Sequence, residues 1–219
     1  MATCLWILAT EAQKVAEKHM PCTAGKLIVM NFQISDSIRI ITWNKAEVYI
    51  RSTIDIDSNK DNEAYKLRYE EIGDNISING KLETDGENGC GHNWHNNRNC
   101  NCCCSCQSQI THEIYIPEGA DISVETINGN IVLSGNIAGI RAHTISGYID
   151  LALSPVRKAD MKMSTISGTL YSNFEFPNSA GHLRHVGGNA LDTQLNGGGG
   201  KPIELETISG NIFLRKAAS

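Results

Sequence analysis

The sequence predicts an all-β protein, a β-solenoid with a short N-terminal helix. One phrase, a polar residue followed by Thr-Ile-Ser/Asn-Gly, occurs four times, at residues 125–129, 143–147, 164–168 and 206–210. The closing glycines lie 18, 21 and 42 residues apart, so the last interval equals two periods of 21. Repeats of this length are typical of solenoids, whose units bury their apolar faces only by stacking on one another.

Apolar residues alternate with polar ones on both sides of each glycine. In the first copy Ile122 and Val124 precede Gly129, and Ile131 and Leu133 follow it. This alternation predicts half-buried strands on either side of a corner, where glycine adopts backbone angles closed to other residues. The threonine three residues before each glycine predicts a ladder of hydroxyls between copies, or reflects only the preference of threonine for strands.

Two features of the repeat leave alternatives open. The double interval before Gly210 predicts a degenerate copy at residues 195–197, after an insertion at 173–192 that is rich in Gly, Asn and His. Ile-Asn-Gly-Asn-Ile is also a signal for a two-residue hairpin, which would give an antiparallel meander instead. Near-constant spacing favours the solenoid, because hairpins do not require it.

The first 24 residues predict an N-terminal helical segment or a residual leader. Residues 10–20 have the pattern of a short amphipathic helix, with Thr10 and Gln13 as a capping box. The apolar run at 5–9 is shorter than the core of an export signal and has no basic segment before it. A single β-solenoid domain is expected over 25–219, with strands at the following ranges: 26–34, 37–43, 47–54, 65–71, 75–84 and 110–116.

Apolar periodicity stops in a Cys/His-rich insertion at residues 85–109. Thiolate and imidazole groups are ligands of zinc and copper, so a zinc or copper site is one hypothesis for this loop. Its candidate ligands are Cys90, His92, His95, Cys100, Cys102, Cys103, Cys104 and Cys106. Three contiguous cysteines cannot all converge on one ion in ordinary backbone, so disulfides, free thiols or a redox-active crosslinking segment are the alternatives. His182 and His185 are further candidates for such a metal site.

No catalytic residue and no cofactor is predicted. A carbohydrate-active enzyme of this shape needs acids or bases on neighbouring strands of one face. Asp121, Asp150 and Asp160 have no acidic equivalent at the matching position of every copy. Glu125 and His143 would be neighbours on one face, which is the nearest approach to a dyad and is also an ordinary surface contact.

The charge and hydropathy of the chain exclude several classes of partner. The net charge is −5 at pH 7, so nucleic acid is not an expected partner, and no basic cluster predicts binding to anionic lipid. No run approaches the ~18 apolar residues that a membrane-spanning helix needs. The residues themselves identify no partner; envelope proteins and surface glycans are the candidates for a protein of the cell envelope.

Several segments are similar to a known family. The segments 43–48, 116–129, 195–199 and 207–216 resemble those of the bacterial putative-adhesin family of unknown function with β-strand repeats, related to toastrack domains. The likeness covers roughly residues 25–216. It implies a single-stranded right-handed parallel β-helix in the bacterial cell envelope, periplasmic or surface-exposed. We therefore expect a non-enzymatic scaffold or adhesin, with a metal-binding or metal-sensing envelope protein and a carbohydrate-active β-helix enzyme as the alternatives.

Overall fold

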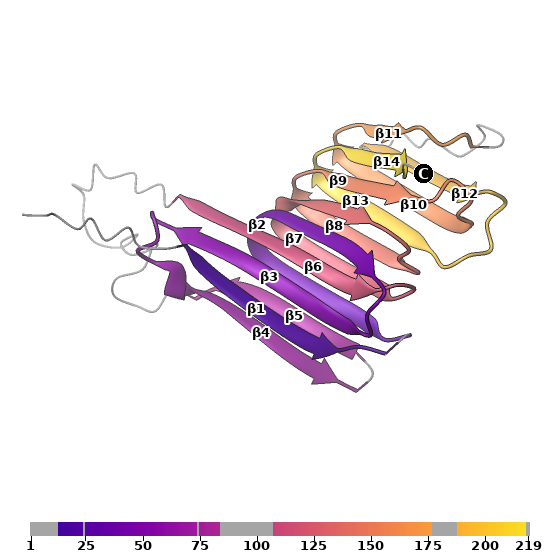
Figure 1. The fold of residues 1–219 in the computed structure, drawn as a ribbon. Coiled ribbons are helices and arrows are strands. Elements are labelled where there is room, and N and C mark those ends of the chain that lie inside the picture. Colours follow the sequence, from indigo (N-terminus) through magenta and orange to yellow (C-terminus); the bar gives the residue numbers. More distant parts are fainter. Residues whose placement is uncertain (1–12, 24, 74, 84–106, 177–187, 218–219) are drawn as a thin grey trace, which may run out of the picture.

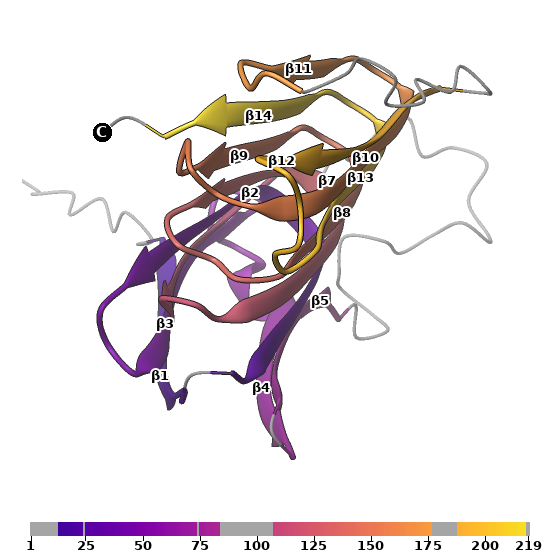
Figure 2. The ribbon, with the colours of Figure 1, turned by 90° about the vertical axis from the view of Figure 1, so that its right-hand side faces the viewer.

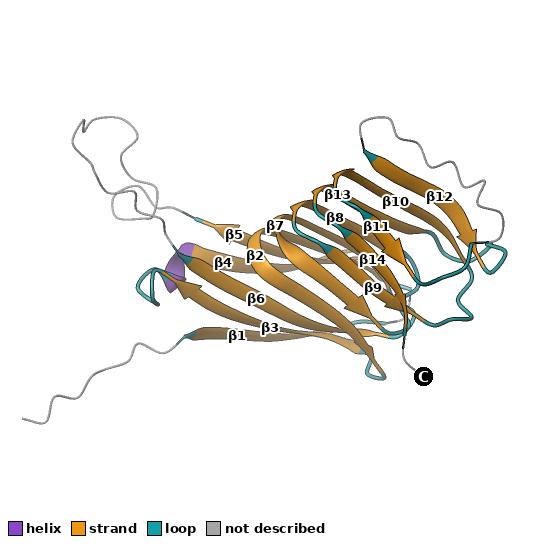
Figure 3. Ribbon diagram, turned by 90° about the horizontal axis from the view of Figure 1, so that it is seen from above, coloured by secondary structure: helices purple, strands orange, loops and turns teal. Residues whose placement is uncertain are grey.

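The computed structural model describes residues 13–23, 25–73, 75–83, 107–176 and 188–217 of the chain. Within these residues it has a mixed sheet of fourteen strands and one short 3-10 helix, η1 (Asn62–Ala64), the purple turn in Figure 3. The all-β prediction is confirmed. The strands, drawn in Figure 1, are β1 (Lys14–Pro21), β2 (Leu27–Trp43), β3 (Glu47–Ile56), β4 (Tyr65–Ile72), β5 (Asn75–Leu82), β6 (Ser108–Pro117), β7 (Asp121–Ser134), β8 (Ile140–Ser146), β9 (Ile149–Leu153), β10 (Ala159–Ser167), β11 (Leu170–Ser172), β12 (Asn189–Leu195), β13 (Ile203–Ser209) and β14 (Ile212–Lys216).

Two long strands, β2 and β7, each belong to two layers of this sheet. The first half of β2 pairs with β5 and its second half with β6, while β7 runs beside both halves. The register of β2 on β7 shifts between Ile34 and Ser37, and such an irregularity lets a pair of strands bend. The first layer has the order β4-β5-β2-β7-β8-β13-β10-β12, and the second layer β1-β3-β6-β2-β7-β9-β14-β11. In Figure 2, β1 and β3 lie opposite β4 and β5.

The apolar core lies between the two layers. In the first copy of the repeat, Ile122 and Val124 face inward from the first layer, and Ile131 and Leu133 from the second. All four side chains are buried, which confirms the alternation predicted around the glycines. The third copy is the exception, because Ser172 takes the place of the last apolar residue and is exposed.

The four copies of the repeated phrase are parallel neighbours in register. Thr126 lies beside Thr144, Thr144 beside Thr207, and Thr207 beside Thr165. The antiparallel meander is therefore wrong for this part of the chain. Antiparallel pairs occur elsewhere, between β1 and β3, β3 and β6, β4 and β5, and β10 and β12.

The copies do not stack in chain order, which corrects the expectation of one continuous coil. Strands β13 and β14 of the fourth copy lie between the second copy and the third, so Gly210 neighbours both Gly147 and Gly168. A physical reason lies in β11 of the third copy, which has three residues and ends at Ser172. That copy offers little apolar surface to the second layer, so it suits the outer end, whereas Ile212 and Leu214 of β14 are fully buried.

The degenerate copy expected at residues 195–197 is also wrong. Strand β12 ends at Leu195 and runs antiparallel to β10, with Leu195 opposite Ala159. Asn196 has a positive φ of 49°, so the chain turns at the residues that were expected to continue a parallel strand. Strand β12 thus forms the edge of the first layer.

The predicted N-terminal helix is wrong in its described part. Residues 14–21 form strand β1, antiparallel to β3, with Glu17 opposite Arg51 and His19 opposite Tyr49. Met20 is buried at the end of this strand. The open edge of β3 offers a full set of backbone partners and opposite charges, and these tertiary interactions outweigh a weak local helical preference.

The corners of the second, third and fourth copies are each held by a threonine that reaches a glycine of the neighbouring copy. The hydroxyls of Thr144, Thr207 and Thr165 donate hydrogen bonds of 3.2, 3.1 and 2.9 Å to the glycine carbonyl of a neighbouring copy. At Gly147, where φ is 140°, an added Cβ would lie 2.2 Å from the carbonyl oxygen of Gly129. The predicted ladder therefore joins threonine hydroxyls to glycine carbonyls of neighbouring copies. Glycine is required at Gly147 because a side chain there would collide with the backbone of the next copy.

Two further expectations concern the Cys/His-rich insertion and a membrane-spanning helix. Residues 85–106 of the predicted Cys/His-rich insertion lie outside the described residues, and β6 begins at Ser108. In the described part of the chain, no helix has the length and apolar character needed to cross a bilayer.

Candidate functional site

The outer face of the first layer contains a groove above β5, β2, β7 and β8. Its volume is about 470 Å³. The groove is lined by polar side chains such as Asn31 and Asn79, which hydrogen-bond at 3.1 Å, and by the exposed side chains of Ile127 and Ile145.

Glu125 and His143 lie in this groove as register neighbours, as the sequence predicted. Asn31 flanks Glu125, and Glu206 flanks His143 on the other side. The four side chains thus form one mixed polar row across four parallel strands. Their arrangement is that of a solvated face, with Glu125 exposed and His143 partly exposed.

The isoleucine of the repeated phrase faces outward beside this row. The four exposed fractions are 50% for Ile127, 39% for Ile145, 38% for Ile208 and 62% for Ile166. Since threonine and isoleucine are adjacent in the phrase, burying the threonine at the corner forces the isoleucine onto the outer face.

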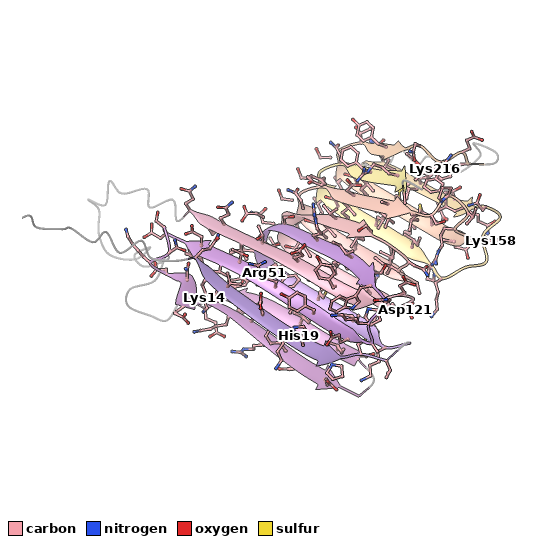
Figure 4. All side chains as sticks on the ribbon, in the orientation of Figure 1. Lys14, His19, Arg51, Asp121, Lys158 and Lys216 are labelled. Carbon is pink, nitrogen blue, oxygen red and sulfur yellow. The ribbon has the colours of Figure 1, made fainter. Side chains whose placement is uncertain are left out.

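The outer face of the second layer carries a cluster of four rings from four different strands. This first aromatic cluster consists of His19, Trp43, Tyr49 and Tyr115. Tyr49 and Tyr115 are opposite each other on β3 and β6, with ring centroids 6.0 Å apart. The Trp43 ring lies 5.2 Å from Tyr115 and 6.1 Å from Tyr49, and His19 lies 4.5 Å from Tyr49. Figure 4 labels His19 and Arg51 on this part of the sheet.

The polar tips of these rings are already bound by the protein. Trp43 Nε1 donates a 2.8 Å hydrogen bond to the carbonyl of Glu47, and the Tyr115 hydroxyl donates one of 3.0 Å to Glu113. That hydrogen bond to Glu113 raises the pKa of Tyr115, while desolvation and a hydrogen bond to Glu17 raise the pKa of Tyr49. The two tyrosine hydroxyls are therefore held protonated, and the Trp43 N–H and the Tyr115 hydroxyl already have partners within the protein.

A row of alternating charge borders the first aromatic cluster. Glu17, Arg51, Glu113 and Arg39 follow one another across β1, β3, β6 and β2. Arg51 Nε lies 3.5 Å from a carboxylate oxygen of Glu17. Because each charge has an opposite neighbour, the row presents many donors and acceptors but little net field.

A second aromatic cluster lies on the same face, at the far end of the second layer. The rings of Tyr171 and Phe213 stack at 5.1 Å and 8°, and Tyr148 meets Phe213 edge to face at 6.0 Å. Tyr171 is 49% exposed and Tyr148 38% exposed. Beside them the guanidinium group of Arg215 donates two hydrogen bonds, of 2.7 and 2.6 Å, to the carboxylate of Asp150.

A buried polar cluster in the core was not predicted. His112 lies between Ser52 and Tyr65, with Nδ1 2.8 Å from the serine hydroxyl and Nε2 3.2 Å from the tyrosine hydroxyl. Its ring stacks on Phe32 at 4.1 Å, and burial lowers the pKa of His112 to about 3. Both ring nitrogens have partners inside the core, so the cluster is structural. The alternation of β6 could have indicated this buried histidine, because His112 lies between Ile110 and Ile114 on the inward side of the strand.

The predicted metal ligands at residues 90–106 and His182 and His185 lie outside the described residues. Among the residues that are described, no group of three or more His, Cys, Asp or Glu side chains could hold a metal ion. Two of the aspartates considered for catalysis have partners on the surface. The Asp121 carboxylate lies 3.0 Å from Lys201 Nζ, and Asp160 accepts a 3.1 Å hydrogen bond from Gln194.

Sequence comparisons find no matching family model and no matching curated protein. The structure is similar to the crystal structure of a "putative cell adhesion protein" from Clostridium sporogenes, with a TM-score of 0.57 and 14% identity over 94% of this chain and 100% of that chain. The resemblance is confirmed at the level of the fold. A "putative adhesin" from Bacteroides fragilis matches with a TM-score of only 0.23 and 8% identity, over 94% of this chain and 98% of that one. This score is too low to show a shared fold.

The aromatic face itself was missed by sequence reasoning. Trp43 and Tyr49 occupy outward positions of strands that were predicted, so their exposure followed from the alternation. Their association with Tyr115 did not, because it depends on the antiparallel pairing of β3 with β6 across more than fifty intervening residues.

Proposed function

We propose that this protein is a non-enzymatic binding module of the bacterial cell envelope, an adhesin-like scaffold that presents its second layer to a ligand. The observation that carries the proposal is the pair of partly exposed aromatic clusters on one face of a rigid sheet. The similarity of the fold to a "putative cell adhesion protein" supports the same role.

A binding role explains why these rings are exposed. Tyrosine and tryptophan provide large contact areas with few rotatable bonds, and they are enriched where binding energy concentrates. Hydrogen bonds and cross-strand stacking hold the rings in place before any ligand arrives, so little conformational entropy would be lost on binding. The core behind them is closed by the buried side chains of both layers.

We propose no catalytic role for Glu125 and His143. They belong to a mixed polar row whose other members are Asn31 and Glu206, on an open face. General acid–base catalysis would require a substrate held between positioned groups, whereas these side chains follow one line across parallel strands in a groove that is open to solvent.

A cell-binding assay tests the proposal. The full chain, fluorescently labelled, is incubated with intact bacterial cells and with isolated envelopes, and bound protein is measured by flow cytometry and sedimentation. We expect saturable binding that the double substitution Trp43→Ala with Tyr171→Ala strongly reduces. The control is Ile166→Ala, which removes an exposed apolar side chain from the outer face of the first layer. Binding that is absent, or equal in all three proteins, contradicts the proposed function.

A further inference from the structure

We infer that the second layer binds a linear, uncharged polysaccharide, whose sugar rings rest on both aromatic clusters at once. The inference rests on the proposed binding function and names the ligand class for it. Neither the fold nor its adhesin-like neighbour specifies a ligand, so we infer the ligand class from the residues on the surface.

The two aromatic clusters lie far apart on the same face. Tyr115 on β6 and Phe213 on β14 both point outward, and the strands between them are β2, β7 and β9. Four strand spacings separate β6 from β14, a distance of about 19 Å. A single small molecule cannot touch both clusters, whereas an extended polymer of several sugar units can.

The floor between the clusters suits such a chain. The outward residues on the connecting strands include Ile41, Val132 and Ala152, which are partly exposed and uncharged. Arg39 on β2 and Asp150 on β9 lie beside them, so the floor offers apolar contact together with charged groups that can hydrogen-bond sugar hydroxyls.

The chemistry of the rings favours sugars. The C–H groups on one face of a pyranose are apolar and weakly positive, so they pack against the negative face of an aromatic ring. The ring hydroxyls of sugars need donors and acceptors at the edge of that contact. The alternating row of Glu17, Arg51, Glu113 and Arg39 supplies both beside the first cluster, and Asp150 with Arg215 supplies both beside the second.

The charge pattern favours an uncharged ligand over an anionic one. Arg51 pairs with Glu17, Arg215 with Asp150, and Lys45 lies 3.8 Å from Glu47 and over the Trp43 ring. An anionic polysaccharide or an anionic membrane would need basic side chains that are not already neutralised. A neutral ligand requires none of these pairs to break.

Affinity gel electrophoresis tests the inference. The full chain is run through native gels that contain hydroxyethylcellulose, xyloglucan, galactomannan, dextran or pullulan, or the anionic polymers alginate and polygalacturonate. We expect retardation by at least one uncharged polymer, weakened about tenfold or more by either Tyr171→Ala or Tyr115→Ala, because each removes a hot-spot ring. Ile166→Ala is the control and should run like the wild type. Thermal melting of every variant separates lost binding from lost folding, since cross-strand aromatic pairs also stabilise sheets.

Chain length gives a second, independent readout. Isothermal titration with oligosaccharides of the bound polymer should show affinity rising until the chain reaches both clusters. The long oligomers should be sensitive to Tyr171→Ala and Tyr115→Ala together, and the shortest to one substitution only. Retardation by anionic polymers alone, or binding that neither folded variant weakens, overturns the inference. If cells are bound through the aromatic face but no uncharged polysaccharide is, the ligand class is wrong and the proposed function stands; if neither is bound, both fall.

Discussion

The hydroxyl of Thr207 donates a 3.1 Å hydrogen bond to the carbonyl of Gly147, which precedes it by 60 residues. This bond fastens the fourth copy of the repeat to the second. It repeats at Thr144 and Thr165, so the corner between the two layers is held by one type of interaction. The flat second layer, on which the aromatic clusters lie, depends on that corner.

The threonine bond predicts the effect of a near-isosteric substitution. Thr207→Val removes the hydroxyl and leaves the Gly147 carbonyl without this donor, so we expect the free energy of unfolding to fall by about 1–2 kcal/mol. Thr207→Ser keeps the donor and serves as the control. Urea denaturation measures both. Wild-type stability of Thr207→Val together with a loss in Thr207→Ser would show that packing of the methyl group, and not the hydrogen bond, matters here.

Replacing Gly147 by alanine should destabilise the protein more than removing the Thr207 hydroxyl, because neighbouring copies approach closely at this glycine. In Gly147→Ala the new Cβ would meet the Gly129 carbonyl oxygen at 2.2 Å, so backbone must move as well as adopt a strained φ. We expect destabilisation of several kcal/mol, above the ~1–3 kcal/mol of strain alone. Gly119→Ala is matched in having a positive φ, but nothing lies within 4 Å of its Cβ position. If denaturant midpoints shift equally in both variants, the steric part of this explanation is incorrect.

Two isoleucines on either side of the corner at Gly147 should respond differently to replacement by aspartate, because one points into the core and the other outward. Ile149 is fully buried, whereas Ile145 is 39% exposed on the outer face of the first layer. Ile149→Asp places an unpaired charge in the core and should cost several kcal/mol or prevent folding. Ile145→Asp should change stability by less than about 1 kcal/mol. Thermal melting followed by circular dichroism compares them, and a near-native midpoint for Ile149→Asp would contradict the assigned core.

Buried His112 predicts that stability depends on acid. Its pKa is about 3 when folded, against about 6.5 for histidine in an unfolded chain. Between these values the unfolded state binds the extra proton, so the stability that neutral His112 provides is complete above pH 6.5 and is lost as the pH falls toward 3. The difference in unfolding free energy between the wild type and His112→Gln should therefore shrink from pH 7 to pH 4. A difference that is constant over this range would show that the histidine is not held neutral.

Local features of this fold could be predicted from the sequence because they depend on alternation. The strands around Gly129 and the inward positions of Ile122 and Ile131 followed from period-two patterns. The order of the copies did not, because the same phrase can pair with any other copy in the same register. Only the poor apolar content of β11, which ends at Ser172, hints that the third copy lies at the end.

The candidate site was predicted least well, for a related reason. Glu125 and His143 come from adjacent copies, so their proximity could be inferred from spacing. The aromatic clusters join residues from strands far apart in the chain, and an isolated Tyr or Trp on an outward position carries no signal of its partners. The helix predicted near the N-terminus failed similarly, since β1 is fixed by its pairing with β3.

The most direct test of the binding face is a crystal structure of the full chain with an uncharged oligosaccharide that binds in solution. Our account predicts sugar density along the outer face of the second layer, over Trp43 and Tyr115 at one end and Tyr171 at the other. Sugar density in the groove beside Glu125 and His143, with the aromatic face empty, would contradict it.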